Sequence, residues 1–227
     1  MRREQGYLSA FVLLFLISAN GFAQSEANSL LEMRIRGDLV KGKTVRAVLA
    51  NVASVYHVPI GFEPPAQLVM RTRSDQAKDQ LVPRDGTLRE VLNEISSIEG
   101  SYQWQIIDGS INVYPTRDRD EVIESILQVR ISRISVLEPT SAMDVGYSIA
   151  EAPEVKNALK SFGLTDIHFY YASESMDRLE KDVKPALTLE NSDVRTVLNR
   201  VIRSTRMKFW AITRWRDDGE FITITTS

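Results

Sequence analysis

The sequence predicts an α+β protein built from two tandem small β-α-β-β-α-β-β modules, each with two amphipathic helices packed on small sheets. Two observations predict this fold. One amphipathic helix pattern occurs four times along the 227 residues. In addition, an offset of 106 residues relates Leu88 to Val194 and also Trp104 to Trp210. Because a helix and a tryptophan share this offset, we interpret the chain as a duplication.

The helix pattern is clearest after Thr87, whose hydroxyl forms the sequence pattern of a capping box with Glu90, three residues later. Thr44 is the expected N-cap of the first helix, and Ser192 or Asp193 that of the fourth. The segments with apolar residues on one helix face are 45–55, 88–98, 155–162 and 194–201.

A hairpin is expected to close each module. In the first module, Asp108 and Gly109 are a strong turn signal, because both residue types tolerate a positive φ. The second hairpin has a longer connection and carries Trp215. The expected hairpin strands are 101–107, 110–114, 208–215 and 221–225.

A buried strand is expected between the helices of each module. Apolar residues alternate over 58–63, and Pro59 places this strand at a sheet edge or at the strand's start. Residues 167–171 match it at an offset of 109. The other expected elements are strands at 33–40 and 126–136 and an irregular connection at 139–151.

A charged segment separates the two modules. Residues 117–121 carry no large apolar side chain and cannot contribute to a core, so we expect a solvated linker and modules that fold separately. The predicted organisation is a signal peptide at 1–23, a first module at 24–116, the linker at 117–121 and a second module at 122–227.

The N-terminus predicts export. Arg2 and Arg3 precede the apolar run 8–19, and small residues ending at Ala23 follow, which is typical of a cleaved signal peptide. The run is shorter than the roughly 20 residues that span a bilayer, so a retained anchor is the less favoured alternative. We therefore expect a periplasmic or secreted protein with no transmembrane segment after cleavage.

Composition and motifs exclude several classes of function. The formal net charge is −2, so no global basic field favours nucleic acid as a partner. The chain has no cysteine, and neither His57 nor His168 has a second ligand at metal-binding spacing. No phosphate-binding loop or nucleophile motif occurs. We therefore predict no catalytic residues, cofactor or metal, and no enzyme.

Two segments together resemble a known family. The stretch TVRAVLANVASVYHVPIGFE, followed by DGTLREVLNEISSIEGSYQWQIIDGSINVYP, is similar to the secretin and TonB N-terminal short domain. Residues from 187 to 225 look like a more divergent second copy. The resemblance implies a non-enzymatic interaction module that binds protein partners in the bacterial cell envelope. Within this sequence we find no pattern of a secretin barrel or receptor domain beside these segments, so we expect neither a channel nor a receptor.

The second module carries the candidate partner-binding residues. Trp215 lies between two arginines in the longer hairpin, and an aromatic side chain flanked by cations is typical of a contact surface. Cations on the fourth helix favour an anionic partner surface. The alternative is a cell-wall or glycan-binding protein that uses the same loop. The candidate residues are Arg203, Arg206, Arg214, Trp215 and Arg216.

Overall fold

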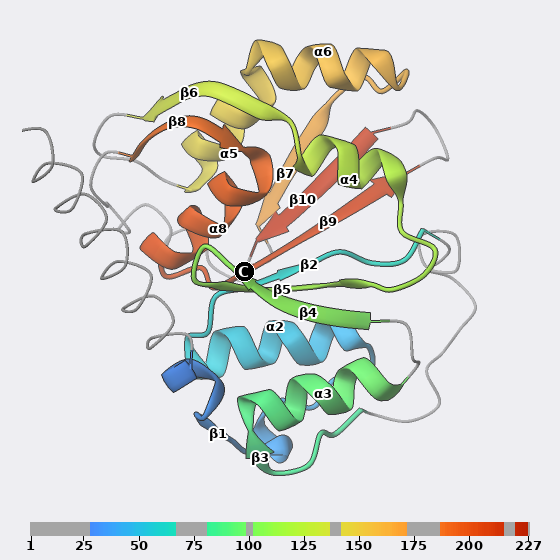
Figure 1. Cartoon of the computed structure of the whole chain (residues 1–227), viewed down its shortest axis with the longest axis vertical. Coiled ribbons are helices and arrows are strands. Elements are labelled where there is room, and N and C mark those ends of the chain that lie inside the picture. The colour runs from blue at the N-terminus through green and yellow to red at the C-terminus, as the bar shows by residue number, and fades with distance from the viewer. Residues whose placement is uncertain are drawn as a thin grey trace, which may run out of the picture.

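A computed structural model of the chain describes residues 28–66, 81–98, 102–136, 142–171, 187–215 and 221–226. It has an α+β fold, as the sequence predicts (Figure 1). The sequence also predicts charged loops at 63–79 and 173–184. The predicted signal peptide at 1–23, residues 67–79 of the first loop and the whole of the second loop lie outside the described residues. We call residues 28–115 the first half and residues 116–226 the second half.

Both halves contain helices and strands. The first half contains β1 (Arg34–Ile35), the 3-10 turn η1 (Gly37–Leu39), α2 (Val45–Tyr56), β2 (Ile60–Phe62), β3 (Gly86–Thr87), α3 (Leu88–Ile98), β4 (Tyr102–Ile107) and β5 (Ser110–Pro115). The second half contains α4 (Glu121–Leu127), β6 (Arg130–Val136), α5 (Ala142–Glu151), α6 (Pro153–Ser161), β7 (Ile167–Tyr171), β8 (Leu187–Asp193), α8 (Val194–Ser204), β9 (Phe209–Trp215) and β10 (Phe221–Thr226).

One mixed sheet runs through both halves, with the strand order β4-β5-β2-β9-β10-β7. In each half the last hairpin strand pairs in parallel with an earlier strand of the same half: β5 pairs with β2, which follows α2, and β10 pairs with β7, which follows α6. The parallel pair β2 and β9 joins the halves. Each half also has a small antiparallel pair, β1 with β3 and β6 with β8.

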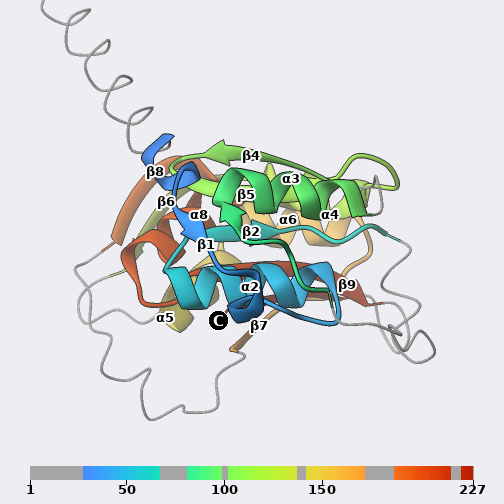
Figure 2. The same cartoon turned by 90° about the horizontal axis from the view of Figure 1, so that it is seen from below.

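The two halves place their helices on opposite faces of this sheet. Helices α2 and α3 lie below it in Figure 1, whereas α4, α5, α6 and α8 lie above it. Figure 2 views the molecule from below and brings α2 to the near side. Strand β9 contributes to both cores, because Phe209 and Ala211 pack with the first half while Trp210 and Ile212 pack with the second. The strands of one half therefore help to bury the other.

The strand register relates the same residues that the sequence offsets relate. In each half, one residue from each of three neighbouring strands forms a row across the sheet. These rows are Ile106, Ile111 and Ile60 in the first half and Ile212, Ile224 and Phe169 in the second. The offset of 106 residues thus relates β4 to β9, and the offset of 109 residues relates β2 to β7.

The predicted helix caps are confirmed. The Thr44 side chain accepts a hydrogen bond from the backbone amide of Ala47 at 3.1 Å. Thr87 and Glu90 form the capping box, since each side chain accepts from the other's backbone amide, at 3.2 and 2.6 Å. At the fourth predicted helix, Asp193 is the residue that caps, through the amide of Thr196.

Several predicted boundaries are wrong. The segment 126–136 starts in α4 rather than in a strand, because Asp120 caps a short helix through the amides of Val122 and Ile123. The expected connection at 139–151 contains α5. The expected strand at 33–40 is only β1 followed by η1. Strand β2 lies in the middle of the sheet, and Pro59 precedes its first residue, so only the interpretation of Pro59 as a strand start holds.

Candidate functional site

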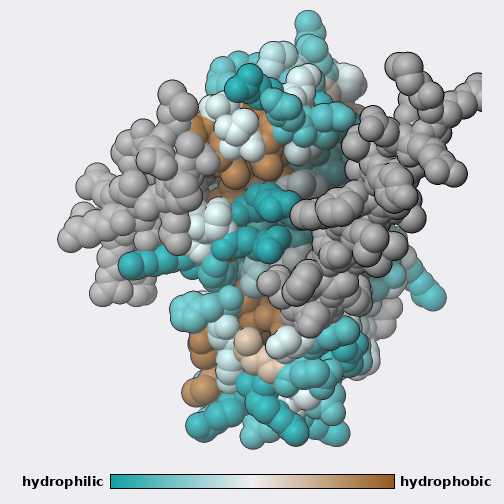
Figure 3. All heavy atoms as spheres, turned by 60° about the vertical axis from the view of Figure 1, so that its left-hand side comes forward, coloured by the Kyte–Doolittle hydropathy of each residue, from teal (hydrophilic) through white to brown (hydrophobic). Residues whose placement is uncertain are grey.

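The cations of α8 contact the first half of the same chain. Arg203 donates from Nη1 to the carbonyl oxygen of Asp108 at 2.9 Å, and Arg200 Nε lies 2.5 Å from the Asp108 carboxylate. A Cβ at Gly109 would lie 2.8 Å from Arg203 Cζ, so the turn and the guanidinium are closely packed. Arg206 is exposed. Figure 3 shows a hydrophilic band across one face of the molecule, between apolar areas above and below it.

The candidate contact residues of the second hairpin are not all exposed. Arg214 is 9% exposed, and its Nε lies 3.3 Å from the carboxylate of Asp120, the residue that caps α4. Arg214 therefore joins β9 to α4 and is not available to a partner, contrary to our expectation for this loop. Trp215 is half-buried at the end of β9. Arg216 lies outside the described residues.

The parallel pairing of β2 with β9 joins the two halves, and we call this pairing the seam. Ile60 donates its backbone N–H to the carbonyl of Lys208 at 2.8 Å, and Gly61 lies opposite Trp210 in the register. A Cβ on Gly61 would lie 2.3 Å from Trp210 Cζ2, which is closer than atoms can approach. Glycine is therefore required at position 61 because the indole of the neighbouring strand packs against the backbone there.

Gly61→Ala should destabilise the protein by about 1–3 kcal/mol, because the added methyl group must displace the fully buried Trp210 ring. Equilibrium denaturation of this variant, of Trp210→Phe and of Gly61→Ala/Trp210→Phe measures the coupling between the two sites. If Gly61→Ala costs as much stability in the Trp210→Phe background as in the wild type, steric conflict with the Trp210 ring is not the cause.

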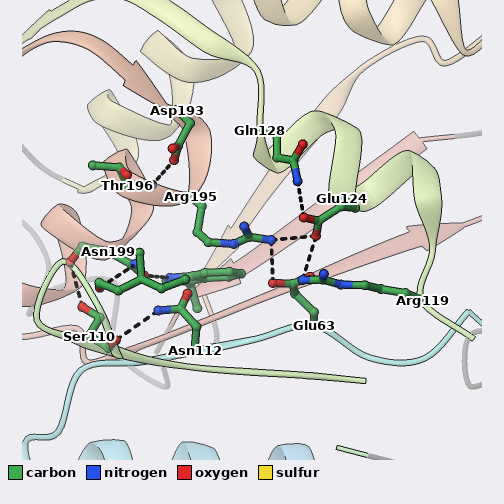
Figure 4. Close-up of polar contacts among 12 residues, drawn as sticks. Glu63, Ser110, Asn112, Arg119, Glu124, Gln128, Asp193, Arg195, Thr196 and Asn199 are labelled. Carbon is green, nitrogen blue, oxygen red and sulfur yellow. Dashed lines mark hydrogen bonds and ion pairs between the residues drawn. The ribbon is translucent and has the colours of Figure 1, made fainter. Parts of the chain in front are cut away.

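A polar network holds the seam on the side of α8. Trp210 donates from Nε1 to Asn199 Oδ1 at 2.9 Å, and Asn199 donates from Nδ2 to the carbonyl of Ile107 in the first half at 3.2 Å. Figure 4 shows Asn199 of α8 beside Ser110 of the β4–β5 hairpin. The first half has the same pair, since Trp104 donates to Asn93 Oδ1 at 3.1 Å. Both the tryptophans and the asparagines are 106 residues apart, so this offset could have identified the pair in the sequence.

Four charged side chains form a second cluster between the halves (Figure 4). Arg195 of α8 contacts Glu63, which follows β2, at 2.9 Å and Glu124 of α4 at 2.8 Å. Arg119 contacts the same two carboxylates at 3.2 and 2.8 Å. The side chain of Glu63 is only 3% exposed. We call these residues, Glu63, Arg119, Glu124 and Arg195, the ionic cluster.

Burial raises the pKa of Glu63, and the positive charges of Arg195 and Arg119 oppose that rise. Arg119 also lies over the ring of Tyr114, with its Cζ 4.5 Å from the ring centroid. It therefore belongs to a packed junction and not to a solvated linker. No local sequence pattern indicates the ionic cluster, because its members come from three distant parts of the chain, at residue 63, at 119–124 and at 195.

The arrangement of these polar groups supports binding between parts of the chain. Arginines contact both carboxylates of the ionic cluster and so compensate the cost of burying their charges. Among the described residues, no group of three or more His, Cys, Asp or Glu side chains is arranged to hold a metal ion. Within that same part of the chain, no helix is long and apolar enough to cross a membrane.

Comparison with known proteins yields no relative: no family model, no curated protein and no solved structure matches the chain.

Proposed function

We propose that this chain is a non-enzymatic, exported protein-binding adaptor of the bacterial cell envelope, located in the periplasm or secreted. The signal-like N-terminus supports the compartment. The resemblance to the secretin and TonB N-terminal short domain supports a protein partner in secretion or TonB-type systems. The duplicated arrangement of strands supports two copies of one such interaction module.

The observation that carries this proposal is the seam between β2 and β9. There, one copy of the arrangement binds a backbone strand of the other and secures it with Trp210, Asn199 and the α8 arginines. The fold thus has within one chain the elements of a protein-recognition surface: a strand that accepts a second strand, a buried aromatic side chain, and arginines that bind the facing turn. An adaptor needs the same elements toward a second protein.

The predicted glycan-binding alternative loses part of its site. It relied on Trp215 with a cation on either side, and Arg214 is buried against Asp120. Likewise, an anionic surface would have to compete with Asp108 for Arg200 and Arg203. A protein partner is therefore the better-supported proposal.

Affinity capture from an envelope extract tests this function. The tagged protein should recover one protein partner in stoichiometric amount, and a bait of matched size and charge should not recover it. Recovery of cell-wall polymer without a stoichiometric protein would instead favour the glycan-binding alternative and overturn the adaptor proposal.

A further inference from the structure

Strand β4 is the end strand of the sheet and corresponds, at the offset of 106, to β9. In β9 the matching edge is occupied by β2, in parallel. Among the described strands, none pairs with that edge of β4. We propose that the outer edge of β4 binds, in parallel, an extended segment of the partner protein with a glycine opposite Trp104. This inference rests on the proposed adaptor function and names its binding site.

The backbone of β4 presents hydrogen-bonding groups along this edge. Ile111 donates its N–H to Pro59, and Val113 accepts from Glu63, both at 2.9 Å, so these groups of β5 point toward β2. Their partners across the β4–β5 ladder, Ile106 and Trp104, therefore form the non-hydrogen-bonded pairs of an antiparallel ladder. Their own N–H and C=O groups point outward, where an added strand would lie.

The side chain of Trp104 sets the requirement for glycine. Its indole is fixed by Asn93 in the way that the indole of Trp210 is fixed by Asn199. In the occupied copy, the residue opposite the indole is Gly61, where no Cβ fits. A strand that is seated in the same way on β4 must have a glycine opposite Trp104.

The residues flanking that glycine should be polar. In β9, Phe209 and Ala211 face the apolar residues of β2 and are buried. The corresponding residues of β4 are Gln103 and Gln105, and both are exposed. Polar side chains next to the glycine can hydrogen-bond to these amides, whereas apolar ones would leave them unsatisfied. A contact of this kind suits a reversible partner.

A second copy of this chain does not fit this description. The other end strand, β7, corresponds to β2 at the offset of 109, so it would be the strand offered to β4. At the position of Gly61, however, β7 has Tyr170, a residue that is 54% exposed. Its Cβ would meet Trp104 as a Cβ on Gly61 would meet Trp210. The occupant is therefore a segment of another protein.

The test uses the full chain and a synthetic peptide, Lys-Val-Thr-Gly-Thr-Val-Lys, that carries this pattern. Amide hydrogen exchange is followed residue by residue. At saturating peptide, exchange at Trp104 and Ile106 should slow about tenfold, as expected for a newly made backbone hydrogen bond. The amide of Gln105, which faces β5, serves as an internal reference and should not change. A control peptide with valine in place of the glycine should not slow exchange at Trp104 or Ile106. This control uses the wild-type protein, so it does not depend on the folding of a variant.

Ile106→Pro removes one outward donor and leaves the β4–β5 ladder intact, because proline is tolerated where the N–H faces away from the sheet. This variant should melt like the control Ile106→Val but lose peptide protection. Absence of protection in the wild-type protein, or equal protection by the valine peptide, overturns the proposed edge. Protection that grows with protein concentration without peptide would assign the edge to a second copy and also overturns it. If Ile106→Pro still captures the envelope partner, the adaptor function stands and only this site is wrong.

Discussion

Trp210→Ala should destabilise the protein by about 3–5 kcal/mol, the range typical of a fully buried aromatic side chain replaced by alanine. Trp210 has no exposed surface, packs against Gly61 and donates a hydrogen bond to Asn199. Its loss leaves a cavity at the seam between the halves and an unpaired acceptor on a buried asparagine. Urea denaturation monitored by circular dichroism measures the loss, since tryptophan fluorescence itself changes in this variant.

Trp104→Ala is the matched control, because Trp104 occupies the corresponding place in the first half and has the same type of bond to Asn93. Trp104 is only half-buried and lies on the end strand. We expect Trp104→Ala to lower the free energy of unfolding by less than half as much as Trp210→Ala, because Trp104 buries less apolar area. Equal losses in the two variants would contradict the special role of the seam.

The elements that the sequence predicted well are those with a strong local pattern. Helices α2, α3 and α8 have full apolar stripes and recognisable N-caps, and the Asp108-Gly109 turn fixes the first hairpin. Helix α4 was missed because it is short: Ile123, Ile126 and Leu127 fill one buried face and the apolar pattern then continues into β6. Periodicity cannot separate a short helix from a strand in such a run.

The sequence also could not predict how the halves meet. The absence of apolar residues in 117–121 suggested separate folding, but the junction is made by β2 and β9 and not by the linker. Phe209 and Ala211 lie in the core of the first half, so a fragment that ends at residue 116 would lack part of that core. Pairing between distant strands leaves no local pattern in the sequence. The offsets of 106 and 109 residues, in contrast, can be read from the sequence.

The sequence could not show which residues the candidate cations contact within the chain. The cations of α8 were predicted to favour an anionic partner and Arg214 to flank a contact tryptophan, and the structure pairs Arg200 and Arg203 with Asp108 and Arg214 with Asp120. Opposite charges far apart in sequence cannot be assigned to each other from composition alone. The same holds for Arg195 and Glu63, which are 132 residues apart.

Arg195→Met should cost about 3–5 kcal/mol at pH 7, the loss expected when one partner is removed from a buried ion pair. The Arg195 side chain is 12% exposed, and its removal leaves the carboxylate of Glu63 with Arg119 as its remaining cation in the ionic cluster. Lys156→Met is the control, because its pair with Glu151 is more than half exposed and should contribute nothing measurable. Thermal and urea unfolding of both variants provide the comparison.

The loss in Arg195→Met should shrink as the pH falls. Burial already raises the folded-state pKa of Glu63 above its ordinary 4.5, and loss of Arg195 removes a charge that opposes this rise. A carboxyl group with a raised folded-state pKa binds its proton more tightly in the folded state, so its contribution to stability is present at low pH and is lost as the pH rises through that pKa. Relative to the wild type at each pH, the variant should therefore recover stability toward pH 4.5. Glu63→Gln/Arg195→Met, which has no carboxyl group to titrate at position 63, should lack this recovery. If the single and double variants depend on pH in the same way, Glu63 is not the buried charge that Arg195 neutralises.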